Sequence, residues 1–123
     1  MTHGAIEWLE IPSRDLKASS DFYSGVFGWK IEISPNMPEY PMFHDTSGHI
    51  GGGFTKEAQP MRDAGVLLFV SVTNMDEMLS IIEKSWGAVT MRKTQISPEV
   101  GWWGRFRDPS GNELGLYESA RKS

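Results

Sequence analysis

Histidine is the residue type best able to carry acid-base or metal chemistry in this chain, because its 123 residues include three histidines and no cysteine. A cysteine nucleophile, a disulfide and a zinc-thiolate site are therefore excluded. His44 and His49 flank a short turn that contains Asp45, so these side chains are candidates for a metal or proton-transfer site. A hairpin whose exposed polar positions are histidine accounts for the same spacing, and His44 is kept only as a candidate catalytic acid or base.

Two glycine-containing motifs point to backbone geometry rather than to chemistry. The run Gly51–Gly53 lacks the lysine and the hydroxyl residue of a phosphate-binding loop, and we expect it to permit a bend or the close approach of another strand. The motif Asp108-Pro-Ser-Gly111 is typical of a turn, and no nearby histidine completes a catalytic triad with its serine.

Composition narrows the remaining classes of function. Twelve Lys and Arg against sixteen Asp and Glu give a net charge of -4, so we expect no nucleic-acid partner, since phosphate binding needs clustered basic side chains. The first residues lack a basic segment followed by an apolar run, and no apolar stretch approaches the ~20 residues that cross a bilayer. We therefore expect a cytoplasmic protein with no membrane partner.

The elements that must position these residues begin with a short strand over 5–12 that ends at a proline. A helix follows from Leu16, with Ser13 or Asp15 as its N-cap and Gly28 as its left-handed end. Alternating or apolar segments then predict three further strands, over 29–34, 42–45 and 50–54.

The second half predicts the same order after a polar linker over 56–64. A continuous apolar strand over 66–72, of the kind buried on both faces, precedes a helix that Asn74 caps and Gly87 closes. The apolar stripe of that helix is Met75, Met78, Leu79, Ile82 and Trp86. Residues 94–100 read as a loop, and strands are predicted over 88–91, 102–107 and 112–118.

Each half is therefore predicted to contain a strand, a helix and three further strands. Short sequence motifs also repeat between the two halves. Asp45-Thr-Ser-Gly48 with Gly52 recurs as Asp108-Pro-Ser-Gly111 with Gly115 at one constant offset. We expect an α+β fold in which two tandem βαβββ modules, residues 5–55 and 65–118, form one domain over residues 1–123. Two such sheets side by side would make a curved half-barrel cup with the helices on its outer face.

At this level of detail the chain resembles the vicinal oxygen chelate superfamily, which includes glyoxalase I, bleomycin-resistance proteins and extradiol dioxygenases. The resemblance covers nearly the whole chain in the expected order. The segments that carry it are Leu9-Glu-Ile-Pro12 with Asp15, Asp21-Phe-Tyr23 through Phe27-Gly-Trp29, Gly51-Gly-Gly-Phe54, Val100-Gly-Trp-Trp103, Asp108-Pro-Ser-Gly-Asn112 and Gly115-Leu-Tyr-Glu118.

The resemblance implies a divalent metal held by one side chain from the first and last strand of each half. Those positions fall here on Trp8, on Gly52 or Gly53, on Leu67 and on Gly115, none of which can coordinate a metal. The chain is thus similar to the metal-free, bleomycin-resistance-like branch, for which we expect no cofactor and no metal. A shift of register by one residue would offer a donor in the first half but none near Leu67.

Strand alternation from these positions predicts the side chains that line the cup. They combine aromatic walls with a few polar groups, as small-molecule pockets do. Two plainer interpretations stay open: the tryptophans fill the cup as core, or Arg105 forms a structural salt bridge with Glu10 or Glu113. The predicted ligand-binding residues are Trp8, Glu10, Phe69, Ser71, Trp103, Arg105, Glu113 and Tyr117.

Three functions follow from this interpretation. The first is a protein that binds a small organic molecule in the cup, without metal and without turnover. The second is an enzyme of the same superfamily, a lyase related to lactoylglutathione lyase, an isomerase or a dioxygenase, with a displaced metal site or with His44 and Arg105 acting on the substrate. The third is a structural or partner-binding module. The resemblance further implies a homodimer.

Overall fold

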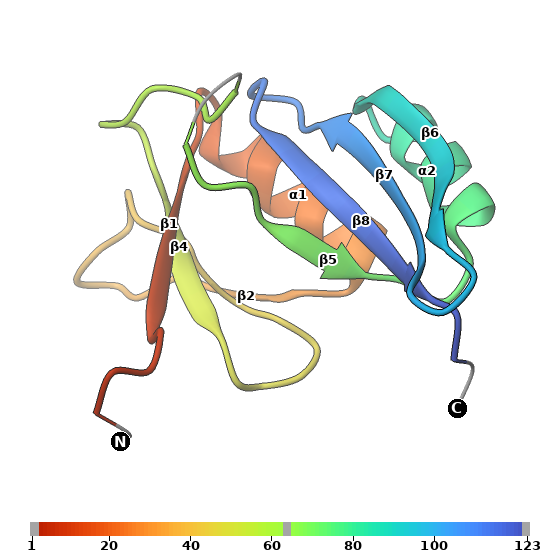
Figure 1. Cartoon of the computed structure of the whole chain (residues 1–123). Helices are drawn as coiled ribbons and strands as arrows, with labels where there is room; N and C mark the ends of the chain where they lie inside the picture. Colours follow the sequence, from red (N-terminus) through yellow and green to blue (C-terminus); the bar gives the residue numbers. More distant parts are fainter. Residues whose placement is uncertain (1–2, 63–64, 122–123) are drawn as a thin grey trace. The chain divides into compact units, whose positions relative to one another are not determined.

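A computed structural model describes residues 3–62 and 65–121, which form two compact units, Met1–Pro60 and Met61–Ser123 (Figure 1). The first unit contains β1 (Trp8–Pro12), α1 (Leu16–Phe27), β2 (Lys30–Glu32), β3 (Met42–His44) and β4 (Gly51–Thr55). The second contains β5 (Phe69–Ser71), α2 (Met75–Lys84), β6 (Ala88–Ser97), β7 (Gly101–Arg107) and β8 (Glu113–Ser119).

Each unit has one four-stranded mixed sheet, and the strand order is the same in both. The order is β1-β4-β3-β2 in the first unit and β5-β8-β7-β6 in the second, so the first and last strands of each unit pair in parallel and the other pairs are antiparallel. This confirms the predicted α+β class and the two βαβββ modules. The module bounds and the assignment to one domain stay predictions.

Helix α1 covers its sheet with an aromatic core. Asp15 is the N-cap and accepts a hydrogen bond from the backbone N–H of Ala18 at 3.0 Å, while Gly28 ends the helix at φ 74°. The rings of Tyr23 and Trp29 stack with centroids 4.7 Å apart, and Trp29 stacks on Phe43 at 4.8 Å. Core packing therefore accounts for much of the aromatic content of this unit.

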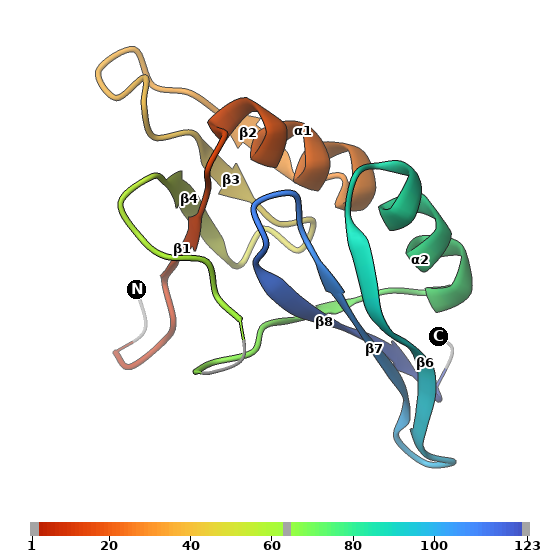
Figure 2. The ribbon, with the colours of Figure 1, turned by 90° about the horizontal axis from the view of Figure 1, so that it is seen from above.

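Helix α2 covers one face of the second sheet (Figure 2). Asn74 caps it as predicted, and the buried Glu118 of β8 accepts a hydrogen bond from the backbone N–H of Met75 at 2.8 Å. A carboxylate at this end of a helix satisfies a free N–H group and interacts favourably with the helix dipole. The fully buried core residues of the unit are Met75, Leu79, Ile82, Phe106, Leu114 and Leu116.

The prediction of a long, doubly buried strand over 66–72 was wrong. Strand β5 contains only Phe69–Ser71 and lies at the edge of its sheet, where β8 is its one neighbour. Val66 is 77% exposed and Phe69 is 48% exposed. An apolar run does not distinguish a central strand from an edge strand whose side chains line a surface.

The end of α2 also differs from the prediction. The helix ends at Lys84, and Trp86 lies outside it with its side chain 88% exposed instead of in the apolar stripe. Trp86, rather than Gly87, takes the left-handed conformation, with φ 74°. Strand β6 continues through residues predicted as a loop and ends at Ser97. Its pairing with β7 contains three register shifts, which period-2 reasoning does not anticipate.

The predicted linker over 56–64 is only partly described, because residues 63 and 64 lie outside the described residues. Within the ranges that are described, no helix has the length and apolar character needed to cross a membrane.

Candidate functional site

The face of the second sheet opposite α2 carries the predicted binding residues of that unit. On β7, Gly104 and Phe106 point toward α2, because a Cβ added to Gly104 would lie 3.0 Å from the Met75 sulfur and Phe106 is fully buried. Alternation then places Trp103 and Arg105 on the opposite face. The register pairs Trp103 with Tyr117, Arg105 with Gly115, Phe69 with Gly115 and Ser71 with Tyr117.

An aromatic pair dominates this face. The ring centroids of Phe69 and Trp103 lie 6.0 Å apart with an interplanar angle of 31°. The Phe69 ring lies over Gly115, where an added Cβ would be 2.6 Å from two ring carbons. Glycine at 115 therefore allows the ring to rest on the backbone of β8. The Tyr117 hydroxyl donates a hydrogen bond to the carbonyl of Val100 at 2.6 Å, which fixes the third aromatic side chain of the face.

A charged cluster lies beside the aromatic pair. The Glu113 side chain is 10% exposed, and its Oε2 lies 2.8 Å from Nε of Arg105. The Nε–H of Arg105 is buried and has no aligned acceptor among the described residues, so this contact is an ion pair without hydrogen-bond geometry. Nε of Arg107 lies 3.4 Å from Oε1 of Glu113, and the Thr90 hydroxyl lies 3.4 Å from Oε2. Arg105 thus pairs with Glu113, one of the two carboxylates predicted as partners.

A cavity of about 440 Å³ opens next to this cluster. The segment before β5 reaches it because Met61 is tied to the start of β8: its backbone N–H donates to Oδ1 of Asn112 at 2.8 Å, and its carbonyl accepts from the N–H of Glu113 at 2.6 Å. Asn112 is itself held by Asp108, so the Asp-Pro-Ser-Gly-Asn motif anchors this segment. The lining residues are Met61, Arg62, Gly65, Val66, Leu67, Arg105 and Glu113.

Sequence reasoning missed Arg62, because residue 62 fell in the predicted linker. The buried side-chain amide of Asn112 is the feature that could have predicted where Arg62 lies. A fully buried asparagine needs hydrogen-bond partners, and the side-chain Oδ1 of Asn112 accepts one from the backbone N–H of Met61, next to Arg62.

In the first unit, Trp8 and Glu10 lie on the sheet face opposite α1 and share a partner. Nε1 of Trp8 donates a hydrogen bond to the Tyr40 hydroxyl at 2.8 Å, and this hydroxyl donates to Oε2 of Glu10 at 2.8 Å. Partial burial raises the pKa of Tyr40; the bond from Trp8 opposes this, and Glu10 adds to it. The phenol therefore stays protonated as the central link of the network. Tyr40 lies in the proline-rich segment before β3, which sequence reasoning treated only as a loop.

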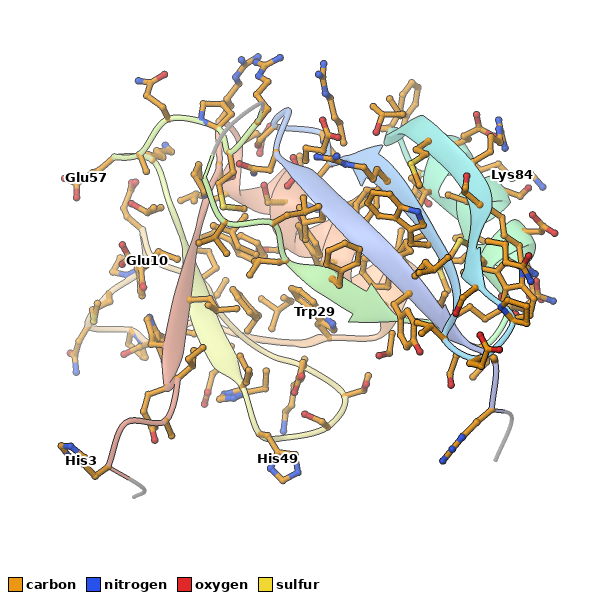
Figure 3. All side chains as sticks on the ribbon, viewed as in Figure 1. His3, Glu10, Trp29, His49, Glu57 and Lys84 are labelled. Carbon is orange, nitrogen blue, oxygen red and sulfur yellow. The ribbon has the colours of Figure 1, made fainter. Side chains whose placement is uncertain are left out.

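The histidines do not pair with Asp45. The Asp45 carboxylate accepts hydrogen bonds from the Ser47 hydroxyl at 2.7 Å and from the N–H of Gly48 at 3.0 Å. Burial raises the pKa of Asp45, but these bonds outweigh it and the pKa is lowered. Nε2 of His44 lies 3.5 Å from Oε1 of Glu32, and His49 points outward at its loop (Figure 3). Asp45 thus shapes the turn, and the role of His44 stays a prediction.

The residues at the positions implied for a metal do not fit one. Gly53, which pairs with Glu10, shares the face of Trp8, whereas a Cβ on Gly52 would meet the buried Phe43. A side chain at 53 would collide with the Tyr40 ring, and one at 115 with the Phe69 ring. Within residues 3–62 and 65–121, no three His, Asp or Glu side chains lie close enough together to hold an ion.

Part of the chain matches a known protein family, and nearly all of it is similar to curated proteins. The family described as bleomycin resistance protein-like N-terminal matches residues 6–44. The anthracycline biosynthesis protein DauV of Streptomyces sp. (strain C5) is 28% identical over 93% of this chain and 46% of its own length. The chain thus spans about half the length of the curated relatives it matches.

Two solved structures are similar over nearly their whole length. A glyoxalase/bleomycin resistance protein/dioxygenase family enzyme from Burkholderia phytofirmans PsJN has a TM-score of 0.74 at 19% identity, covering 91% of this chain and 96% of that chain. TnmS3, an antibiotic binding protein from Streptomyces sp. CB03234, has a TM-score of 0.70 at 18% identity, covering 97% and 98%. The chain thus shares the fold of these solved glyoxalase/bleomycin resistance-type proteins, and its residues 6–44 are similar to the bleomycin resistance protein-like N-terminal family.

Proposed function

We propose that this protein binds a planar organic molecule on the sheet face of the second unit, without a metal and without turning it over. The observation that carries the proposal is the Phe69–Trp103 ring pair. Trp103 is two residues along β7 from Arg105, which lines a cavity of about 440 Å³. Phe69 is 48% exposed although it is an apolar side chain on a sheet face. Covering it with a flat ligand would remove that surface from water and add ring stacking.

The names of two similar proteins support a fused-ring aromatic ligand. One is an anthracycline biosynthesis protein and the other an antibiotic binding protein. An anthracycline contains a planar ring system of the shape that two tilted aromatic side chains can hold. We therefore propose this ligand class for the second unit, with Tyr117 and Ser71 at the rim of the same face.

We propose a second, smaller contact surface on the first unit, formed by Trp8, Glu10 and Tyr40. The Trp8 indole is 45% exposed, while its N–H is already bonded to Tyr40. The indole face is thus oriented without needing a ligand to satisfy its polar atom. Such a preorganised aromatic surface loses little side-chain entropy when a flat molecule binds.

The enzyme alternative depends on His44. Its register partner Gly51 also pairs with Trp8, so His44 lies on the same sheet face as the Trp8 surface, next to Glu32. If the alternative holds, a bound molecule is chemically changed and His44→Ala abolishes the change while binding persists. Mass spectrometry of the ligand after incubation distinguishes turnover from simple binding.

We also propose that the protein is a homodimer, as the superfamily resemblance implies. Light scattering at micromolar concentration measures the mass in solution. A mass equal to one chain would contradict the dimer.

Calorimetric titration with anthraquinone-2-carboxamide, an uncharged planar fused-ring molecule, tests the proposed binding. We expect saturable binding that EDTA dialysis leaves unchanged and that Phe69→Ala or Trp103→Ala weakens by about tenfold, the effect of ~1.4 kcal/mol of lost stacking and burial. Trp86→Ala is the matched control, because it removes an exposed aromatic side chain that lies outside this face. Absence of binding, or equal weakening by Trp86→Ala, would contradict the proposal.

A further inference from the structure

We propose that the ligand of the second unit carries a carboxylate, which Arg62 and Arg105 bind in the cavity beside the aromatic pair. The inference rests on the proposed function and adds to it the chemical class of the ligand, a planar aromatic carboxylic acid. It follows from the positions of the two arginines, from the state of Glu113 and from the spacing along β7.

Arg105 is fixed and accessible at the same time. Its Nε lies 2.8 Å from Oε2 of Glu113, while a third of the side chain, 33%, remains exposed, and the residue lines the cavity. A guanidinium has five N–H donors, so the Nε contact with Glu113 leaves most of them for another acceptor. An arginine held in this way loses little side-chain entropy when an oxyanion binds, because its position is already set.

Arg62 brings a second positive charge to the same cavity. Its Nη2 lies 3.3 Å from the place where a Cβ on Gly111 would stand, so the guanidinium rests on the turn before β8. The two hydrogen bonds that tie Met61 to Asn112 and Glu113 fix the backbone immediately before it. The segment before β5 and strand β7 thus bring Arg62 and Arg105 to one cavity.

Glu113 is the negative charge that an anionic ligand must tolerate. Its carboxylate is buried, with Arg105 on one oxygen and Arg107 on the other. Among the described residues that line the cavity, two are positively charged and one is negatively charged. The cavity therefore favours an anion over a cation or a neutral group.

The spacing along β7 links this anion site to the aromatic pair. Trp103 and Arg105 are two residues apart on one face of the strand, a separation of roughly 7 Å. A flat ring against Phe69 and Trp103 would place a carboxylate on its edge near Arg105. The cavity volume of about 440 Å³ is within the usual range for small-molecule sites, about 300 to 1,000 Å³.

The experiment compares two probes that differ only in charge, anthraquinone-2-carboxylate and its neutral amide, anthraquinone-2-carboxamide. Isothermal titration at pH 7.5 measures the affinity of each for the full chain. We expect the carboxylate to bind at least tenfold more tightly, and we expect this ratio to fall when sodium chloride is raised from 50 to 500 mM.

Three single variants locate the charge that discriminates the probes. Arg62→Gln and Arg105→Gln should each reduce the carboxylate-to-amide ratio about fivefold or more while leaving amide binding nearly unchanged. Arg92→Gln removes an equal charge from the same unit, at a side chain that pairs with Glu83 and is 66% exposed, and should leave the ratio unchanged. Arg62→Gln keeps the test decisive if Arg105→Gln unfolds the unit, because Arg62 makes no ion pair with Glu113 in the structure.

The outcomes separate the two proposals. Equal affinities for carboxylate and amide, or an equal loss of discrimination in Arg92→Gln, would overturn the carboxylate site while the binding face stands. Binding of neither probe to the wild-type chain would overturn both. The inference is supported if the wild-type chain binds the carboxylate more tightly than the amide, and if only Arg62→Gln and Arg105→Gln reduce this preference.

Discussion

Replacing Trp86 with glycine should stabilise the protein, although it removes the largest natural side chain. Trp86 follows the last turn of α2 at φ 74°, in the left-handed region where a Cβ meets the following carbonyl oxygen. Its side chain is 88% exposed, so deleting it gives up little buried apolar surface. The backbone N–H of Gly87, which bonds the carbonyl of Ile82 at 2.9 Å, needs no side chain at position 86.

The expected size of the effect is the difference between two opposing contributions. Relieving a left-handed conformation at a non-glycine residue gains roughly 1 to 2 kcal/mol. The added freedom of glycine in the unfolded chain costs roughly 0.4 to 1 kcal/mol. The Trp86→Gly change should therefore raise the free energy of unfolding by about 0.8 kcal/mol, which corresponds to a rise in melting temperature of about 3 °C for a chain of this size.

Urea unfolding followed by far-UV circular dichroism measures this change without depending on tryptophan fluorescence. Trp86→Ala is the control, because alanine keeps the Cβ and the strain while it also loses the indole. The order of stability should be Trp86→Gly above wild type, with Trp86→Ala close to wild type. If the glycine variant unfolds at the same urea concentration as the alanine variant or below it, left-handed strain at this position is refuted.

Three further perturbations test the packing of the two units. Gly52→Ala places a Cβ against the backbone carbonyl of Leu9, which cannot move away, so chemical unfolding should show a loss of about 2 to 3 kcal/mol; an equal loss in Gly115→Ala, where only the half-exposed Phe69 ring must move, would contradict this reasoning. Glu118→Ala leaves the N–H of Met75 without its carboxylate and should cost about 2 kcal/mol, measured in the same way; a wild-type midpoint would show that the contact is not stabilising. The lowered pKa of Asp45 contributes stability above pH 3.8 that is lost as pH falls through the folded-state pKa. Asp45→Asn should therefore make the free energy of unfolding depend less on pH in the acidic range. An unchanged dependence on acidic pH would contradict this contribution of Asp45.

The fold was predictable because each module repeats the same local patterns. The caps at Asp15 and Asn74, the glycine end of α1 and the turn before β8 all act over a few residues, and the structure places them as the sequence indicates. The extent of β5 and the end of α2 were not predictable in this way. Whether an apolar strand is central or at an edge depends on pairing with residues far away along the chain, and no local rule predicts a left-handed Trp86 next to an available glycine.

The sheet face on which the predicted binding residues lie was predictable in part for a related reason. Period-2 alternation correctly separates the side chains of β7 and β8 that face α2 from those that do not, once one position is known. The residues that sequence reasoning missed, Tyr40 and Arg62, lie in segments without regular structure. Their positions follow from side-chain hydrogen bonds that reach across 30 residues or more, to Glu10 from Tyr40 and to Asn112 from the segment before Arg62.

An aromatic ring covers the glycine at an implied metal position in each unit, Gly53 in the first and Gly115 in the second. Tyr40 lies over Gly53 and Phe69 lies over Gly115, so an aromatic ring takes the space that a coordinating side chain would need. A donor at either position would have to displace a ring that the surrounding contacts already hold, by hydrogen bonds in one unit and by Trp103 in the other. The glycines and the rings depend on each other, because each ring can lie on the strand only where no Cβ stands. Installing a metal ligand at 115 therefore requires a second change at 69, and the same coupling links 53 with 40.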